Sequence, residues 1–225
     1  MEKITFKNSR NLNINGLFHP VDSDSVIILC HGLGGDNSEW GRFEPTATKF
    51  NEAGYNVLRF DFGGCGESYK APLILENHLD DYKSAISYLE NKGFKKIIVL
   101  GLSFGGLIAT KANDSRVQAL ILWAPMTNPK NYRWEERFST SELKELKYDE
   151  WIEIQQEKML TKTNVPTLII QGDSDRIIQK DDTLKAAELI KDSTLYMIEN
   201  DTHDLKELDI FIDKTIAWLK ITNYL

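Results

Sequence analysis

A serine lies between two glycines in the segment GLSFG, residues 101–105, directly after the apolar run 97–100. The spacing G-x-S-x-G is typical of a sharp turn from a strand into a helix, which lifts the serine hydroxyl beyond the end of the sheet. Such a serine can attack a carbonyl carbon once a base removes its proton. We therefore predict a nucleophile at Ser103. The alternative is a small residue at a crowded junction.

The loop after the apolar run 26–30 reads HGLGG and offers backbone donors for a developing oxyanion. Glycine-rich backbone at a strand end leaves N–H groups free to point into a pocket. We expect the donors to be the N–H groups of Leu33 and Phe104, the second at a helix N-terminus, where the dipole favours negative charge. His31 is interpreted as a structural histidine, because the chemistry of this loop comes from its amides.

A base for the serine must come from four histidines. His19 precedes Pro20 at the end of a predicted hairpin, and His78 lies near the start of a predicted surface helix, so both are interpreted as solvated or structural. His203 lies in a polar loop between the last predicted strand and the last predicted helix. By elimination and by topology, His203 is the candidate base.

The base in turn needs a carboxylate that fixes its tautomer and stabilises the imidazolium. The loop after the predicted strand 167–171 reads GDSDRII and offers Asp173 and Asp175. Both residues follow a strand end, so this pattern alone leaves the choice between them open.

Short strand-like runs alternate with longer helical patterns along the chain. Residues 3–7 and 11–18 alternate polar and apolar side chains, which predicts an opening hairpin of edge strands. Apolar runs typical of parallel strands covered on both faces follow at 26–30, 57–60, 97–100, 119–123, 167–170 and, shorter, 195–198. Helical patterns lie at about 42–53, 76–92, 104–113, 180–190 and from 207 onward. The alternation predicts an α/β fold with a mostly parallel, doubly wound sheet of about eight strands and ligands at the C-terminal strand ends.

Residues 126–163 break this alternation, with no clear strand, dense charge and several aromatic side chains. A structureless loop of this length is uncommon in a compact domain, so we expect a small helical cap inserted over the strand ends. Trp134, Phe138 and Trp151 are candidates for contacts with a substrate, or else form a core for the cap itself. The length of 225 residues predicts one domain, 1–225, with 126–163 as its cap.

Several motifs together resemble the α/β-hydrolase family over essentially the whole chain: HGLGG, GLSFG, DFGGCGES at 61–68, and the order serine, aspartate, histidine. The resemblance implies the α/β-hydrolase fold and a Ser-His-Asp triad. In this family the acid follows its strand in the pattern G-x-x-D-x-x-[VI], which implies Asp175, with Ile178 closing the motif and Asp173 as a turn residue. The short chain with a modest insertion is also similar to bacterial feruloyl or cinnamoyl esterases and to monoacylglycerol lipases.

This resemblance implies a serine carboxylic-ester hydrolase that acts on a small acyl or aryl ester through an acyl-enzyme, without a metal or organic cofactor. Related haloalkane dehalogenases and epoxide hydrolases use an aspartate at the elbow, and dienelactone-type enzymes favour a cysteine, so Ser103 argues against them. An aminopeptidase, acyl-peptide hydrolase or thioester hydrolase would use the same triad. A cap carboxylate that binds a substrate amino terminus would mark an aminopeptidase, and Glu135 and Glu136 are its candidates, with ordinary exposed charge as the favoured explanation of both. A small-molecule receptor on this scaffold is the non-enzymatic alternative.

Composition narrows the partners and the location. The net charge of −7 argues against a nucleic-acid partner. Cys30 and Cys65 make neither a disulfide framework nor a metal cluster. The N-terminus lacks a leader-like apolar segment, and no run approaches the ~18 apolar residues of a membrane span. We expect a cytoplasmic protein whose partner is a small-molecule ester, and the sequence indicates no oligomeric state.

Overall fold

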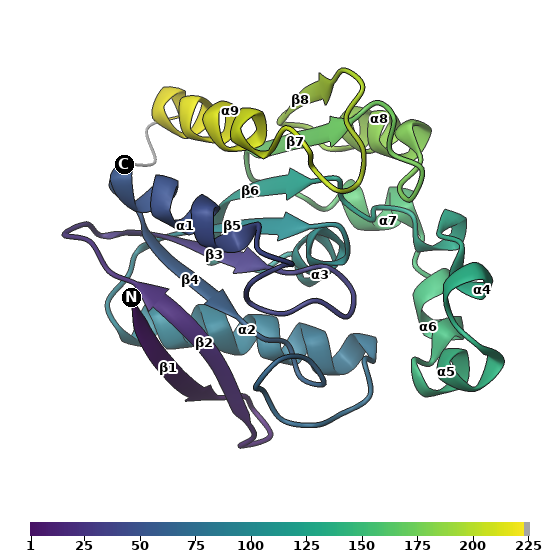
Figure 1. Ribbon diagram of the computed structural model, residues 1–225, viewed down its shortest axis with the longest axis horizontal. Coiled ribbons are helices and arrows are strands. Elements are labelled where there is room, and N and C mark those ends of the chain that lie inside the picture. Colours follow the sequence, from purple (N-terminus) through teal and green to yellow (C-terminus); the bar gives the residue numbers. More distant parts are fainter. Residues whose placement is uncertain (223–225) are drawn as a thin grey trace.

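The computed structural model describes residues 1–222 and contains one eight-stranded sheet with helices on both faces (Figure 1). The strand order is β1-β2-β4-β3-β5-β6-β7-β8; β1, β2 and β4 pair antiparallel, and all other neighbours pair parallel. The strands are β1 Glu2–Lys7, β2 Asn13–His19, β3 Ser25–Cys30, β4 Asn56–Phe60, β5 Lys96–Leu102, β6 Val117–Trp123, β7 Thr167–Gly172 and β8 Ser193–Ile198. The predicted mostly parallel sheet and its opening hairpin are confirmed.

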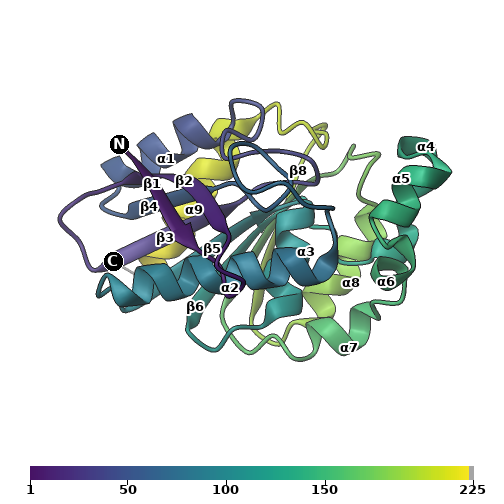
Figure 2. The same cartoon turned by 90° about the horizontal axis from the view of Figure 1, so that it is seen from below.

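Helices cover the sheet in two layers because side chains of successive strand residues point to opposite faces. In β3, Ile27 and Leu29 pack with α1 and α9, whereas Val26 and Ile28 belong to the core shared with α2, α3 and α8. Figure 2 shows α1 and α9 on one side of the sheet and the other three helices on the opposite side. These helices are α1 Phe43–Glu52, α2 Leu75–Asn91, α3 Phe104–Ala112, α8 Lys180–Leu189 and α9 Leu208–Ile221.

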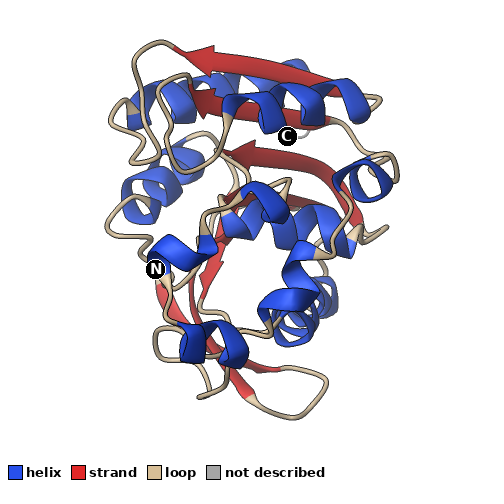
Figure 3. Ribbon diagram, turned by 90° about the vertical axis from the view of Figure 1, so that its right-hand side faces the viewer, coloured by secondary structure: helices blue, strands red, loops and turns tan. Residues whose placement is uncertain are grey.

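The segment 126–163 consists of short helices that lie at the end of the sheet where the parallel strands finish. Figure 3 looks onto this end, with the short helices in front of the strands. They are η1 Pro129–Asn131, α4 Trp134–Arg137, α5 Thr140–Glu145, α6 Tyr148–Ile152 and α7 Gln156–Leu160. The segment is therefore helical, as expected, while its role as a cap on a single domain 1–225 stays a prediction.

Two glycines allow α3 to approach the neighbouring strands closely. A Cβ on Gly105 would overlap the carbonyl oxygen of Cys30 at the end of β3, and a Cβ on Gly101 would lie 2.5 Å from the amide nitrogen of Gly106. Any side chain at Gly105 would therefore push α3 away from the sheet. The glycines of the GLSFG motif are required by this crowding.

Replacing Gly105 with alanine should lower the free energy of unfolding by about 3 kcal/mol or more, because the new Cβ meets rigid backbone. Gly93→Ala is the matched control: its φ is +95° and nothing lies within 4 Å of its Cβ, so we expect only the cost of backbone strain, about 1–2 kcal/mol. Urea unfolding followed by circular dichroism measures both. Equal losses in the two variants would show that the contact with Cys30 is relieved easily.

Candidate active site

Ser103 lies in a strained turn between β5 and α3. Its backbone has φ 51° and ψ −112°, a conformation that side-chain-bearing residues rarely adopt. Its N–H donates to the carbonyl of Trp123 at 2.9 Å, and its own carbonyl accepts from the N–H of Met126 at the same distance. These bonds to β6 and the segment after it hold the turn, and Ser103 lines a cavity with 5% of the residue exposed. Such strain is typical of a nucleophile elbow.

His203 and Asp175 are brought together from loops that follow β8 and β7. His203 Nδ1 lies 2.8 Å from Asp175 Oδ2, and the carboxylate is fully buried. Its other oxygen accepts the N–H groups of Ile177 at 2.8 Å and Ile178 at 2.9 Å. One carboxylate oxygen is thus held by backbone and the other by the imidazole. With Nδ1 as donor, Nε2 of His203 is the ring nitrogen that can accept a proton.

Asp173 makes different contacts. Its Oδ1 accepts the N–H of Asn200 at 2.8 Å and the hydroxyl of Ser174 at 3.1 Å. The Asp173 carboxylate therefore links the loop after β7 to the loop after β8, as a structural turn residue does. The carboxylate that contacts the imidazole is that of Asp175.

The candidate oxyanion donors lie at the ends of β3 and β5. Phe104 is the first residue of α3, so its N–H has no partner within the helix. Leu33 is half-buried in the loop after β3 and lines the same cavity as Ser103. The structure thus places both candidates where the two strand ends adjoin.

His31 ties this loop to its neighbour. Its Nδ1 lies 2.8 Å from the carbonyl of Gly32, and its Nε2 accepts the N–H of Phe62 at 3.1 Å, in the loop after β4. A carbonyl requires a donor at Nδ1 and an N–H requires an acceptor at Nε2, so one neutral tautomer satisfies both contacts. Both ring nitrogens are used, in agreement with a structural role.

The remaining two histidines are buried and neutral. Burial, assisted by the Arg59 guanidinium, lowers the pKa of His19 to about 4, and its Nε2 accepts from Arg59 Nε at 3.0 Å. Burial lowers the pKa of His78 to about 3, and its ring contacts those of Phe62 and Phe104 at centroid distances of 5.0 and 5.1 Å. Of the two interpretations, solvated or structural, the buried side chain of His78 fits the structural one.

A cavity of about 430 Å³ opens beside Ser103. It lies between the strand ends and the first part of the helical segment. Its lining residues are Gly32, Leu33, Glu39, Trp40, Arg42, Leu102, Ser103, Tyr132, Arg137, His203 and Asp204. The sequence had singled out neither the Glu39–Arg42 segment nor Tyr132 and Arg137.

The three aromatic candidates of the helical segment lie elsewhere. Trp134 and Trp151 are buried, and their indole N–H groups donate to the carbonyls of Pro129 and Leu146 at 2.7 and 2.8 Å. Phe138 is half-buried, with its ring centroid 6.1 Å from that of Trp134. Of the two interpretations, a core for the segment itself accounts for both tryptophans. None of the three is among the described residues that line the Ser103 cavity.

Glu135 and Glu136 are also directed away from the cavity. Glu135 Oε1 accepts the Tyr148 hydroxyl at 2.8 Å, and Glu136 pairs with Arg133 at 3.2 Å; both glutamates are exposed. Within residues 1–222, the carboxylates that line the cavity are those of Glu39 and Asp204.

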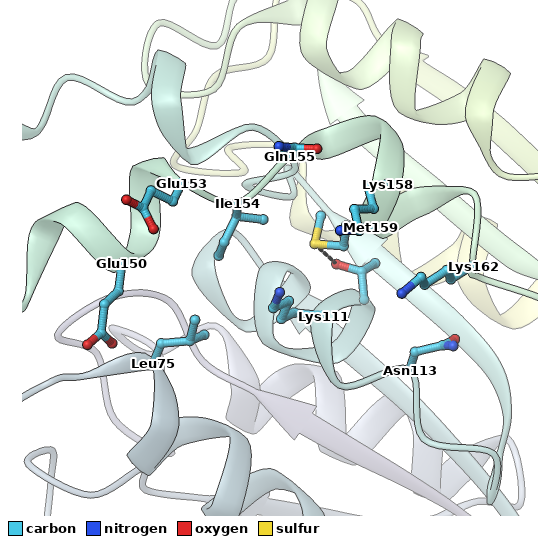
Figure 4. Close-up of a pocket in the computed structure, with 11 residues that line it drawn as sticks. Leu75, Lys111, Asn113, Glu150, Glu153, Ile154, Gln155, Lys158, Met159 and Lys162 are labelled. Carbon is cyan, nitrogen blue, oxygen red and sulfur yellow. Dashed lines mark hydrogen bonds between the residues drawn. The ribbon is translucent and has the colours of Figure 1, made fainter.

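A second hollow of about 320 Å³ lies between α3 and the helices α6 and α7 (Figure 4). Lys111, Lys158 and Lys162 gather on one side of it, with Glu150 and Glu153 on the other. It does not include Ser103 or His203, so the larger cavity, which both of these residues line, is the candidate site.

Over the part of the chain that the structure describes, no cluster of three or more histidine, cysteine or acidic side chains could hold a metal ion. Cys30 and Cys65 are buried free thiols. Within the same residues, every helix is too short or too polar to cross a membrane.

Comparison with known proteins identifies relatives by sequence. A family model described as serine aminopeptidase, S33 matches residues 22–152, more than half of the chain. The quorum-quenching protein AidA of Acinetobacter baumannii is 36% identical over 111 residues, which cover 46% of this chain and 36% of that protein. A 2-hydroxy-6-oxononadienedioate/2-hydroxy-6-oxononatrienedioate hydrolase of a Pseudomonas species is 33% identical over 102 residues, or 44% and 35% of the two chains. The chain thus matches only about a third of the length of these relatives.

Solved structures share the fold over almost the whole chain. Est1E from Butyrivibrio proteoclasticus, solved with ferulic acid bound, has a TM-score of 0.84 at 20% identity and covers 96% of this chain and 97% of its own. The Pyrococcus furiosus esterase Pf2001 has a TM-score of 0.79 at 19% identity, with 97% and 91% covered. These similarities confirm the α/β-hydrolase fold.

Replacing Asp175 with asparagine should reduce kcat for hydrolysis of p-nitrophenyl acetate by about 10⁴-fold, because an amide would not hold the histidine tautomer that accepts a proton. Asp173→Asn, two residues away, is the matched control and should change kcat less than about threefold. Steady-state kinetics on both variants measures the difference. A larger loss for Asp173→Asn would assign the acid to the other aspartate.

Proposed function

This chain belongs to the serine aminopeptidase S33 family, within the α/β-hydrolase fold, and we propose that it is a serine carboxylic-ester hydrolase for small acyl or aryl esters. The observation that carries the proposal is the 2.8 Å contact between His203 Nδ1 and Asp175 Oδ2, because it orients an imidazole that lines the same cavity as Ser103. A positioned base beside a strained serine is the arrangement that acyl transfer requires.

In the proposed mechanism, Ser103 Oγ bonds to the acyl carbon while His203 Nε2 takes the hydroxyl proton. The carbonyl oxygen becomes an oxyanion, which the N–H groups of Leu33 and Phe104 stabilise. Collapse breaks the bond to the alkoxide, which leaves with the proton from His203. Water then repeats the sequence on the acyl-enzyme and releases the carboxylic acid. Asp175 holds the imidazole and stabilises its cationic form throughout.

The names of similar proteins support ester chemistry. The structural neighbours include Est1E, solved with ferulic acid bound, and the Pyrococcus furiosus esterase. The aromatic side chains of Trp40, just before α1, and Tyr132, in the segment 126–163, line the Ser103 cavity, and Trp40 is 65% exposed. An exposed indole beside the nucleophile offers a flat apolar surface for an acyl or aryl group.

Aminopeptidase activity is the second candidate, favoured by the description of the matched family. It needs a carboxylate for the substrate ammonium group. Of the two carboxylates that line the cavity, that of Glu39 is buried and engaged with Gly32 and Arg42, which leaves the exposed side chain of Asp204. Arg137 lines the same cavity and would offset the attraction of Asp204 for an ammonium group, so ester hydrolysis fits the site better.

Two other uses of the fold are a thioester hydrolase and a non-catalytic receptor. A thioester hydrolase would use the same catalytic groups and differ only in its leaving group. A non-catalytic receptor would gain nothing from a serine held at φ 51° or from an imidazole aligned by a buried carboxylate. Both arrangements cost free energy and are explained by catalysis.

Ser103→Ala and His203→Ala should each lower kcat for p-nitrophenyl butyrate by about 10⁴-fold or more, because nucleophile and base act as one unit. The double variant should be no slower than either single variant. Ser141→Ala, an exposed serine of the helical segment, is the control and should retain full turnover. Near-normal turnover in Ser103→Ala or His203→Ala would refute the mechanism.

A substrate panel should separate ester from aminopeptidase activity. We expect kcat/KM for p-nitrophenyl butyrate or methyl ferulate to exceed that for leucine p-nitroanilide by at least about 10³-fold. N-acetyl-leucine p-nitroanilide, which lacks the ammonium group, should be cleaved at least as fast as the free amine, since Arg137 offsets the attraction of Asp204 for a cation. A strong preference for the free amine would favour the aminopeptidase instead. Monoacylglycerols and acyl thioesters in the same panel would define the leaving group.

A further inference from the structure

Glu39 and Arg42 form an ion pair in the wall of the Ser103 cavity. Arg42 Nη2 lies 3.3 Å from Glu39 Oε1, and the two side chains are 18% and 1% exposed, respectively. Both residues lie just before α1, and neither belongs to the proposed catalytic groups.

The Glu39 carboxylate holds the loop that carries the proposed oxyanion donor. Its Oε2 accepts the N–H of Gly32 at 2.7 Å, one residue before Leu33. The carboxylate also fills the space beside two glycines: a Cβ on Gly32 would lie 3.2 Å from Oε1, and one on Gly35 would lie 2.7 Å from Oε2. The Glu39 side chain therefore packs against Gly32 and Gly35, on either side of Leu33, and we expect the direction of the Leu33 N–H to depend on it.

Arg42 extends the contact to the loop of the proposed base. Its Nη1 donates to the carbonyl of Asp204 at 3.1 Å, and Asp204 directly follows His203. The guanidinium also lies 5.5 Å from the ring centroid of Trp40, which limits its freedom. One guanidinium thus joins the loop after β3, through Glu39, to the loop after β8.

This arrangement is costly to the fold. Glu39, Trp40 and Gly41 all have left-handed backbone, with φ of 46°, 51° and 85°. Burial raises the pKa of Glu39, because a carboxylate loses its hydration there. Arg42 Nε is buried and has no hydrogen-bond partner in the described structure. Apolar side chains of similar size often stabilise a fold better than a buried ion pair does, so stability alone does not explain the pair.

We propose that Glu39 and Arg42 are positioning residues for the ester hydrolysis proposed above, on which this inference rests. Glu39 fixes the direction of the Leu33 N–H toward the oxyanion. Arg42 fixes the loop of His203 relative to that N–H, so that the proton acceptor and the oxyanion donor keep one geometry. Neither side chain reacts with the substrate.

The test separates transition-state positioning from simple folding. Glu39→Ala should lower kcat for p-nitrophenyl butyrate by about 30-fold, less than the loss of an oxyanion donor itself, with KM changed less than about threefold. The inhibition constant of a trifluoromethyl ketone, whose hemiketal oxyanion occupies the same hole, should rise by about the same factor as kcat falls. Arg42→Ala should show the same pattern, and the double variant should be about as slow as the slower single variant.

Conservative variants and a control variant separate an effect on kcat from a loss of folding. Glu39→Gln keeps an acceptor for Gly32 but not the charge for Arg42, and Arg42→Lys cannot reach both Glu39 and Asp204 with one ammonium group, so each should show a smaller fall in kcat. Glu44→Gln removes an exposed carboxylate from the same segment and should leave all constants unchanged. Thermal melting shows whether each variant is folded.

Two outcomes would overturn the inference. If folded Glu39 and Arg42 variants keep kcat and inhibitor affinity and lose only thermal stability, the pair is structural and the proposed esterase stands. If the wild-type protein shows no Ser103-dependent ester hydrolysis, the proposed function fails and the positioning role fails with it. The comparison of wild type with Ser103→Ala distinguishes these two cases.

Discussion

The close approach of α3 to the end of β3 is the constraint on which the site depends. Gly105 lies against the carbonyl of Cys30, so the chain must turn sharply between β5 and α3. That turn forces Ser103 into left-handed backbone and leaves the Phe104 N–H at the start of the helix without a helical partner. The backbone positions of the proposed nucleophile and of one proposed oxyanion donor therefore follow from a single packing contact, and the loop after β3 lies beside them for the same reason.

Most of the fold could be predicted because its strands are buried on both faces. Runs such as 97–100 are apolar throughout, a pattern typical of a parallel sheet covered by two helical layers. Parallel strands end at one edge, so residues that follow β5, β7 and β8 had to meet there. The chain order therefore predicted that Ser103, Asp175 and His203 would lie close together, and the structure brings Asp175 and His203 into contact.

The sequence could not show which way the side chains of residues 126–163 point. Aromatic residues serve equally well in a pocket and in a small core, and the five short helices of this segment give too few turns for periodicity to distinguish the two cases. Trp134 and Trp151 pack inward, while Tyr132 and Arg137 line the cavity. Glu39 could not be identified from the sequence for another reason. Its partners Gly32 and Arg42 are close to it in the sequence, but Arg42 also contacts the carbonyl of Asp204, which lies far away along the chain.

The helical segment is anchored to the same residue that begins α3. The Trp151 ring lies 4.9 Å from that of Phe104, between centroids, and Phe104 contacts the buried ring of His78. The outer part, with α4 and α5, connects to this anchor through Trp134, whose ring centroid lies 6.3 Å from that of Trp151. Because the backbone of Phe104 is a proposed oxyanion donor, a shift of α6, which carries Trp151, would move a ring that packs against this donor residue. Differences in substrate selection among similar chains should therefore arise from the outer part and from the Trp40 turn, where changes leave the anchor intact.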